Sequence, residues 1–436
     1  MVDFPRVLFI TPVAFNPYSG GGATFSSLFE GWPKDRLATV HNDPSPSPND
    51  VCANYFVLRP DELDFIQPFS LLRGARNTIQ ASRATPAVAH GRRNGRLFDA
   101  ARRVLLGDSI PQRAHLTAPL ERWIADFQPQ AIYTILGSNG MMSLIEKIRV
   151  RFNLPLVVHI MDDWAAAAHR TGLFASLERQ RTKRWLRHFF HHAQTCLGIS
   201  SAMCAAYTDR YGREFIPFQY ALDRERWGSI HKRDLSVRKT PELLYVGSIF
   251  PNAQLTSLID CSVAVAELEK EGFPIIFRVV TSRENSARFG HLLNKNACTI
   301  IEPSEGDDAA FFQRLVDADV LLLPVNFDRD SIDFIRYSMP TKVPAYLNSG
   351  TPVLAYGPEG TAQARYAAEG WAIKVTERSL EALKTAIKRV LLNENLRDSL
   401  SISARAAAAN HDARLVRASF QAILCDAAQR QNQLGR

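Results

Sequence analysis

The chain is poor in cysteine and contains no long apolar segment. Its six cysteines are scattered over 436 residues, with no Cys-x-x-Cys pair and no cluster of cysteines and histidines. This spacing argues against a structural zinc site and is typical of proteins from a reducing compartment. No run of about 18 or more apolar residues is present, so no membrane-spanning helix is predicted. The apolar segment Val7–Phe15 is interrupted by Pro12 and precedes no cleavage site. We interpret it as a strand and expect a cytoplasmic protein.

Positive charge is in excess. The chain has 52 lysines and arginines against 44 acidic residues, which gives a net charge of +8. This balance favours anionic partners, such as nucleotide diphosphates, lipid phosphates, an anionic membrane surface or nucleic acid. No nucleic-acid recognition motif is visible, so we expect no nucleic-acid partner.

Short apolar segments alternate with helical patterns, which predicts a parallel α/β architecture. The length suits two domains, which we place at 1–225 and 241–410, each a doubly wound, Rossmann-like fold. A helical tail follows over 411–436. The expected strands are Val7–Thr11, Ala38–His41, Ala131–Ile135, Leu156–Ile160 and Thr195–Ile199 in the first domain, and Glu242–Val246, Ile275–Val280, Thr299–Glu302, Val320–Pro324, Thr351–Ala355 and Ala372–Val375 in the second.

Residues 70–113 form a basic insertion, with nine arginines against two acidic residues. Two interpretations remain open, namely contact with an anionic membrane or lipid-linked acceptor, and an ordinary solvated insertion. A second basic stretch, Arg179–His192, also contains aromatic residues. We expect this stretch to be a helix whose aromatic side chains face the core.

The segment Ser338–Gly357 carries the clearest functional signal. Pro340 and Thr341 open a short helix that has Lys342 at its start, and a buried strand follows. Amides at a helix start together with one ammonium group suit a phosphate or diphosphate, and no metal is needed. The alternative is an ordinary helix-to-strand connection with a surface lysine.

Two segments of the first domain are candidates for the opposite side of a cleft. Gly20, Gly21 and Gly22 are expected to form a loop that lets backbone amides approach a ligand. This is not Gly-x-Gly-x-x-Gly, so a nicotinamide enzyme is disfavoured. Asp162 and Asp163 end a strand, where a carboxylate could act on an acceptor hydroxyl. They could instead cap the next helix, and nearby His159 could be a core histidine.

These motifs resemble those of GT-B glycosyltransferases, in particular the family-four-like bacterial enzymes of polysaccharide assembly. The matching positions are Ser338, Pro340, Thr341, Lys342, Tyr346, Leu347, Gly350, Pro352, Val353 and Leu354, with Gly357 and Pro358 in the loop that follows. The resemblance implies two Rossmann-like domains facing a cleft, with a C-terminal helix that crosses back to the first domain. It further implies metal-independent transfer, with retention, from a nucleotide-diphosphate sugar to a glycan or lipid-linked acceptor, without a bound cofactor.

The resemblance also assigns roles to residues. Asp162, Asp163 and Lys342 would be catalytic. The substrate-binding set would be Gly20, Gly21, Gly22, His159, Gly247, Ser248, Arg283, Ser338, Pro340, Thr341, Gly357, Pro358 and Glu359. The protein would be cytoplasmic or peripheral on the inner face of a membrane.

The chain departs from the family pattern at several positions. Ala345 stands where many members have a glutamate that hydrogen-bonds the ribose, and Tyr337 stands at the other glutamate position. Ser248 replaces an arginine. Glu359 is one substitute for the ribose contact. A noncatalytic binding or scaffold protein with this fold is therefore the alternative function. Asp328-Arg329-Asp330 matches the Asp-x-Asp metal motif of GT-A enzymes, but we expect no metal site.

Overall fold

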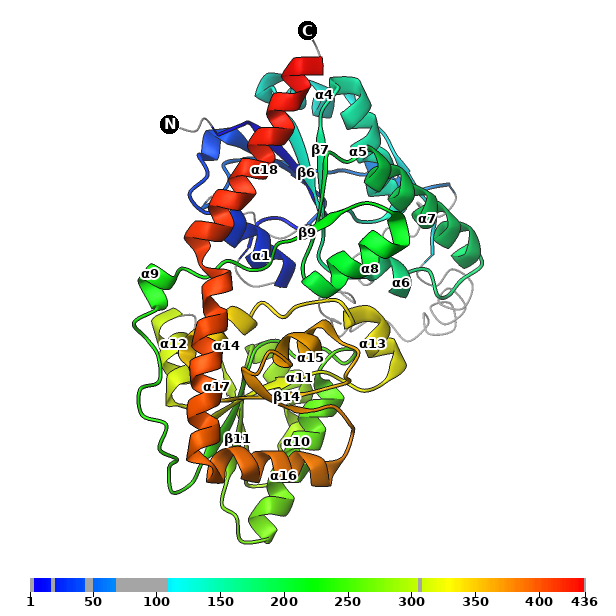
Figure 1. Cartoon of the computed structure of the whole chain (residues 1–436). Coiled ribbons are helices and arrows are strands. Elements are labelled where there is room, and N and C mark those ends of the chain that lie inside the picture. The colour runs from blue at the N-terminus through cyan, green and yellow to red at the C-terminus, as the bar shows by residue number, and fades with distance from the viewer. Residues whose placement is uncertain (1–3, 17–19, 44–49, 68–108, 305–307, 435–436) are drawn as a thin grey trace.

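The computed structural model describes residues 4–16, 20–43, 50–67, 109–304 and 308–434. Most of the predicted basic insertion at 70–113 therefore lies outside the described residues. Two α/β domains lie one above the other, and the C-terminal helices run along both of them (Figure 1). The predicted fold class, two Rossmann-like domains with parallel sheets, is confirmed.

The first domain contains a seven-stranded parallel sheet with strand order β3-β2-β1-β6-β7-β8-β9. Its strands are β1 (Val7–Ile10), β2 (Leu37–His41), β3 (Asn54–Val57), β6 (Ala131–Thr134), β7 (Leu156–Ile160), β8 (Thr195–Gly198) and β9 (Phe215–Pro217). Its helices are α1 (Gly20–Phe29), α4 (Ala118–Phe127), α5 (Asn139–Phe152), α6 (Trp164–Ala167), α7 (Ala175–His192), α8 (Ser201–Tyr211) and α9 (Arg224–Trp227), with a 3-10 turn at Lys34–Arg36. A small antiparallel pair, β4 (Leu63–Phe65) with β5 (Gln112–Ala114), lies on either side of the undescribed segment 68–108.

The second domain contains a six-stranded parallel sheet with order β12-β11-β10-β13-β14-β15. Its strands are β10 (Glu242–Val246), β11 (Ile276–Thr281), β12 (Thr299–Pro303), β13 (Val320–Pro324), β14 (Val353–Tyr356) and β15 (Ala372–Val375). Its helices are α10 (Leu255–Lys270), α11 (Arg283–Leu293), α12 (Asp308–Asp317), α13 (Arg329–Ile335), α14 (Val343–Ser349), α15 (Ala362–Ala367), α16 (Leu380–Leu392) and α17 (Glu394–Ala407).

Each sheet has a topological switch point, where the strand order reverses. In the first sheet it lies between β1 and β6, and in the second between β10 and β13. Ligands of open parallel sheets bind beyond the carboxyl ends of the strands at such points. The switch points therefore place the ends of β1 and β10 at the two most favourable positions for a ligand.

The chain crosses between the domains twice, and the two crossings lie side by side. Leu222 leaves the first domain and pairs with Asp412, which returns to it after α17 and the 3-10 turn Ala408–His411. The Leu222 N–H donates to the His411 carbonyl at 2.8 Å, and the Ala413 N–H donates to the Leu222 carbonyl at 2.9 Å. These bonds tie the two connections into one short bridge.

The last helix, α18 (Ala413–Leu434), packs on the first domain rather than the second. Its Phe420 is fully buried and makes edge contacts with Phe29 and Tyr133, with ring centroids 5.0 and 5.3 Å apart. Phe218 lies against the same ring. The first domain is therefore completed by a segment from the far end of the chain.

Candidate active site

The site in the second domain is built around the turn that follows β10. Gly247 has φ +140°, a backbone conformation that residues with a side chain rarely adopt. Lys342, just before α14, reaches into this turn, and an added Cβ at Gly247 would lie 2.4 Å from Lys342 Nζ. A glycine is therefore needed both for the turn and for the space that the ammonium group occupies. Two residues far apart in the sequence meet at the switch point.

Tyr245 supports both partners of this arrangement. Its fully buried ring lies under the lysine, with Lys342 Nζ 3.9 Å from the ring centroid. Its hydroxyl donates to the carbonyl oxygen of Ser248 at 2.6 Å and so holds the turn. The sequence analysis missed Tyr245, because within the apolar strand Glu242–Val246 it looks like any other core residue.

The charge of Lys342 is not compensated by the protein. Burial around the ammonium group lowers the pKa of Lys342 to about 7. Among the described residues no carboxylate pairs with it, and its contact is the ring of Tyr245. Removing a cation from water without an anionic partner is costly. A phosphate or diphosphate beside Lys342 would offset this cost.

Backbone amides contribute less than the sequence suggested. The Gly247 N–H donates to the Val280 carbonyl at 2.9 Å, and the Gly357 N–H donates to the Val375 carbonyl at 3.0 Å. Both amides therefore continue the strand pairing and are not available to a ligand. Helix α14 spans only seven residues, so its dipole is weak. The candidate phosphate site rests on Lys342 and on the space that the glycines leave.

The segment that leads to Lys342 is held from both domains. The Ser200 hydroxyl, at the start of α8 in the first domain, donates to the Tyr337 carbonyl at 2.6 Å. From the second domain, the Ala362 N–H donates to the Arg336 carbonyl at 2.6 Å. The segment is thus fixed across the interface between the domains.

Three predicted residues follow in this segment. The Ser338 hydroxyl oxygen is buried and has no hydrogen-bond partner among the described residues, which leaves it available to a ligand. Pro340 and Thr341 turn the chain into α14, and the Pro340 carbonyl accepts from the Val343 N–H at 3.0 Å. Both are half-buried.

The loop after β14 brings Gly357 close to the end of β13. An added Cβ at Gly357 would lie 2.7 Å from the Cβ of Val325, so glycine permits this approach. Pro358 then leads toward α15. Glu359 is exposed and pairs with Lys374 of β15 at 3.1 Å. Its carboxylate is therefore engaged, which weakens the idea that it replaces the missing ribose contact.

The positions of the two missing glutamates offer no carboxylate either. Ala345, in α14, is buried in the hydrophobic core. Tyr337 is half-buried and packs against the same core. Arg283 is exposed at the start of α11, just beyond the carboxyl end of β11, which neighbours β10. Because it forms no ion pair with a described residue, it can supply charge at the same sheet edge.

In the first domain, the glycine run is helical rather than a loop. Gly20, Gly21 and Gly22 form the first turn of α1, so the prediction of a glycine loop was wrong. An added Cβ at Gly21 would lie 3.7 Å from the sulfur of Met161. The start of α1 therefore adjoins the loop after β7, which carries the two aspartates.

The two aspartates have different surroundings. Asp163 is buried, and its carboxylate accepts a 2.7 Å hydrogen bond from the Tyr207 hydroxyl and faces Arg210 at 3.3 Å. These contacts give Asp163 a structural role within the domain. Asp162 is half-buried, and its carboxylate accepts from the N–H of Trp164, the first residue of α6, at 3.1 Å, whereas the N-cap residue Asp163 makes no side-chain capping bond. Of the two, Asp162 is the better candidate to meet an acceptor.

His159 is a satisfied core residue. Its Nδ1 lies 2.7 Å from the Tyr133 hydroxyl and its Nε2 lies 3.2 Å from the Phe218 carbonyl. Complete burial lowers the pKa of His159 to about 3, so the ring is neutral at physiological pH. Since a carbonyl only accepts, Nε2 carries the proton and Nδ1 accepts from Tyr133. This geometry leaves no ring nitrogen for a substrate.

The two domains also contact each other through an ion pair. Arg170, just after α6, pairs with Asp330 at 2.5 Å and Asp333 at 3.1 Å, both in α13. Asp328 caps α13, because its carboxylate accepts from the Ser331 N–H at 2.9 Å. Both carboxylates of the Asp-x-Asp motif are thus engaged within the protein. The described residues contain no group of three or more potential metal ligands.

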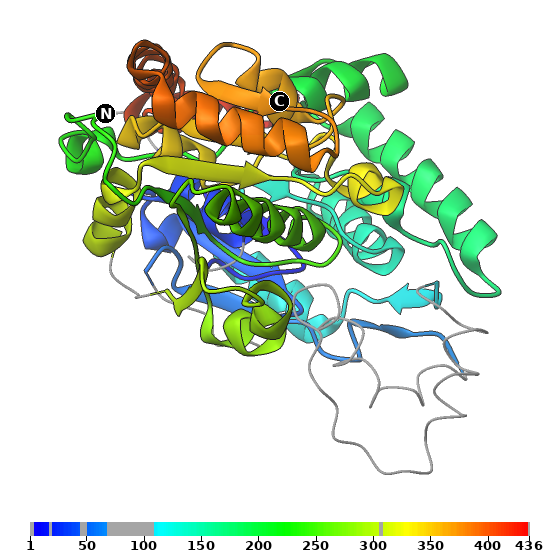
Figure 2. The same cartoon turned by 90° about the horizontal axis from the view of Figure 1, so that it is seen from below.

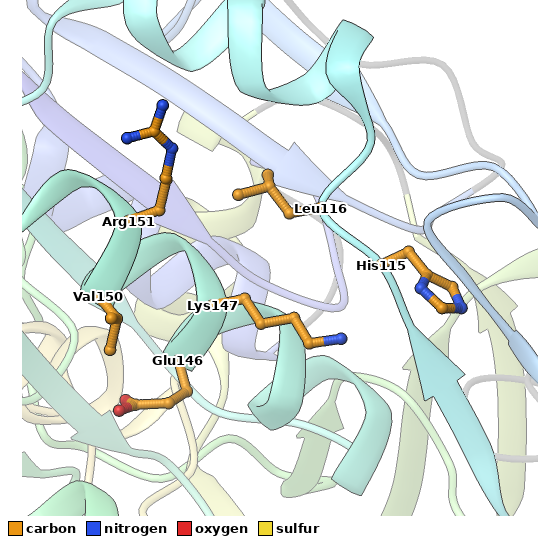
Figure 3. Close-up of a pocket in the computed structure, with 6 residues that line it drawn as sticks. All are labelled: His115, Leu116, Glu146, Lys147, Val150 and Arg151. Carbon is orange, nitrogen blue, oxygen red and sulfur yellow. The ribbon is translucent and has the colours of Figure 1, made fainter.

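A hollow of about 610 Å³ lies elsewhere in the first domain, between α5 and the segment that joins β5 to α4 (Figure 3). It is lined by His115, Leu116, Glu146, Lys147, Val150 and Arg151. Three of its charged groups have protein partners: Lys147 donates to the Ala114 carbonyl, Glu146 pairs with Arg149, and Arg151 pairs with Glu121. It is therefore a poor candidate for a charged substrate.

Comparison with solved structures places the whole chain in one architecture. Trehalose-6-phosphate synthase OtsA superposes with a TM-score of 0.62 at 11% identity, over 96% of this chain and 98% of that one. The chain has the GT-B fold. The Anabaena protein Alr3699/HepE, in complex with UDP and glucose, gives 0.59 at 12% identity, with 96% and 99% covered. WaaG, a glycosyltransferase involved in lipopolysaccharide biosynthesis, gives 0.58 at 14% identity, with 96% and 99% covered.

The resemblance seen in the sequence is thereby confirmed at the level of the fold. No protein-family model and no curated protein sequence matches the chain. Within the part of the chain that the structure describes, no helix is both long and apolar enough to span a membrane.

Proposed function

We propose that this protein is a glycosyltransferase that moves a sugar from a nucleotide-diphosphate sugar to a glycan or lipid-linked acceptor. The observation that carries the proposal is the desolvated ammonium group of Lys342, without an anionic partner, beside Gly247 at the switch point of the second sheet. The GT-B fold supports it, because HepE of the same fold was crystallised with UDP-glucose.

In this proposal the second domain binds the donor. Negative charge develops on the diphosphate as it leaves the sugar, and Lys342 stabilises that charge from a site with little water. Ser338 and Arg283 supply a hydroxyl and a further positive charge. Because the cation is provided by the chain, the reaction is proposed to need no metal. Retention of the anomeric configuration remains part of the proposal.

The first domain would bind the acceptor. Asp162 lies at the end of β7, beside the start of α1, and would orient the acceptor hydroxyl. The loop also ends near Arg170, whose ion pair joins the two domains. Acceptor and donor sites would therefore face each other across the cleft.

The decisive experiment begins with a thermal-shift screen against UDP, GDP, ADP, CMP and dTDP and their sugars. A nucleotide at a hundredfold excess over its dissociation constant stabilises the folded state by about 2.7 kcal/mol. One nucleotide family should raise the melting temperature. In Lys342→Ala the shift should vanish and turnover should fall by about 10²–10³-fold. Lys374→Ala, which removes a lysine paired with Glu359, is the matched control. Wild-type turnover in Lys342→Ala would refute the proposal.

A noncatalytic binding or scaffold protein is the second candidate. It is favoured by Ala345, which leaves the ribose position without an acceptor, and by Ser248 in place of an arginine. A nucleotide that shifts the melting temperature but is never hydrolysed or transferred, with any tested acceptor, would support this candidate. No shift with any nucleotide would support it more strongly.

A further inference from the structure

Helix α7 presents an unusually basic outer face. Lys183, Arg184 and Arg187 are exposed and form no ion pair with a described residue. The helix contains one acidic residue, Glu178, which is buried and bonded to Asn139. The outer face therefore carries positive charge without compensation.

Two exposed leucines lie at the beginning of the helix, one just before it and one in its first turn. Leu173, just before α7, is 73% exposed and Leu177 is 51% exposed. Leu177 and Arg184 are seven residues apart, so they lie on the same side of the helix, two turns from each other. The opposite side, with Leu186, Phe189 and Phe190, is buried in the core. The aromatic residues of this stretch thus face the core, as predicted.

We infer that the α7 face, defined as Leu173, Leu177, Lys183, Arg184 and Arg187, docks on an anionic lipid bilayer. The positive charges match the lipid headgroups, and each lysine or arginine near such a surface contributes about 1 kcal/mol. The leucines can bury apolar surface in the headgroup region of a bilayer, whereas a soluble polyanion offers no apolar region for them.

The position of the face supports this occupant. Helix α7 lies along the outside of the first domain in both views (Figures 1 and 2). Leu173 follows Arg170, whose ion pair with Asp330 bridges the domains. The leucine end of the face therefore lies near the contact between the domains, and docking would bring that contact close to the lipid surface.

The chain also returns to the described structure beside this face. The Ser109 hydroxyl donates to the Thr171 carbonyl at 2.8 Å, two residues before Leu173. Ser109 directly follows the arginine-rich sequence at 68–108. The inference does not depend on the proposed enzymatic activity.

The test is co-sedimentation of the full chain with phosphatidylcholine vesicles, with and without phosphatidylglycerol. We expect binding only when the anionic lipid is present, and weaker binding as salt is added. Lys183→Glu/Arg187→Glu should weaken binding by at least about thirty-fold, since two contributions of about 1 kcal/mol are lost. The matched control is Lys270→Glu/Arg389→Glu, which makes the same charge change at exposed positions on α10 and α16 of the second domain. It should bind like the wild type.

A second pair of variants tests the leucines. Leu173→Ser should weaken vesicle binding several-fold, whereas Leu392→Ser, at an equally exposed position (73%) on α16, should not. If Leu173→Ser binds like the wild type, the face is a general polyanion surface and the membrane inference is wrong. Equal binding to neutral vesicles, or equal loss in both charge-reversal variants, would also overturn it.

Discussion

The lowered pKa of Lys342 makes donor binding depend on pH in a defined way. In the free protein this pKa is about 7, because burial disfavours the charged form. A bound diphosphate favours the ammonium form and raises the pKa toward or above the ordinary lysine value. Binding therefore takes up a proton between about pH 7 and the higher pKa of the bound form, and the apparent dissociation constant rises with pH in this range.

The size of the pH effect follows from the pKa of Lys342 in the free protein and in the complex. At pH 8 about nine-tenths of the free Lys342 side chains are neutral, so binding takes up about 0.9 proton. Between pH 6.5 and 8.5 the apparent dissociation constant should rise about 25-fold, equivalent to about 1.9 kcal/mol. Affinity is lost as pH rises, since the binding-competent charged form becomes rarer.

Isothermal titration calorimetry measures both the proton uptake and the apparent dissociation constant. The nucleotide sugar that gives the largest thermal shift is titrated in buffers of different ionisation enthalpy. A sugar diphosphate is preferable to a free nucleoside diphosphate, because its esterified phosphate does not titrate near neutral pH. Lys342→Arg keeps a charge throughout and should bind with little dependence on pH.

Two results would refute the reasoning. One is a wild-type dissociation constant that changes less than about threefold over this range. The other is an unchanged pH dependence in Lys342→Arg, which would show that a different group titrates.

The remaining predictions concern the same turn and the expected metal independence. Gly247→Ala should abolish nucleotide binding, because its Cβ would displace the ammonium group of Lys342. The control is Gly272→Ala, which also places a side chain at positive φ (+81°) but in open space, and which should bind normally. Calorimetry of both variants measures the difference. Tyr245→Phe keeps the ring and loses one hydrogen bond, so binding should weaken by about 1 kcal/mol, while Tyr245→Leu also loses the aromatic contact and should weaken it further. Asp328→Ala removes a helix cap and should lower the free energy of unfolding by about 0.5–2 kcal/mol without changing turnover. Turnover of the wild type should be unchanged in EDTA, and loss of activity in EDTA would contradict the proposed metal independence.

Much of the fold could be predicted because its strands are buried on both faces. Strands such as β7 and β10 are continuous apolar segments, and their predicted bounds match the structure. The prediction missed β3 and β9, since β3 is partly exposed and β9 has only three residues. Both are edge strands, where burial imposes a weaker sequence pattern.

The site was predictable in its parts but not in its assembly. Lys342 and Gly247 were each identified from local motifs, yet their contact depends on the order of strands in the sheet. Asp163 shows the limit more clearly, because Tyr207 and Arg210, which engage it, are 44 and 47 residues further along the chain. No local pattern distinguishes it from Asp162. The partner of Glu359, on the next strand, was hidden for the same reason.

The return of α18 to the first domain has a consequence for biosynthesis. Phe218 and Phe420 pack together, but 202 residues separate them in the order of synthesis. At about 5–20 residues per second, about 10–40 s pass between their emergence from the ribosome. During that interval the aromatic surface around Phe29 and Tyr133 has no cover. During this interval chaperones can bind the exposed aromatic surface of the nascent first domain. A premature stop before α18 would leave that surface permanently exposed and prone to aggregation.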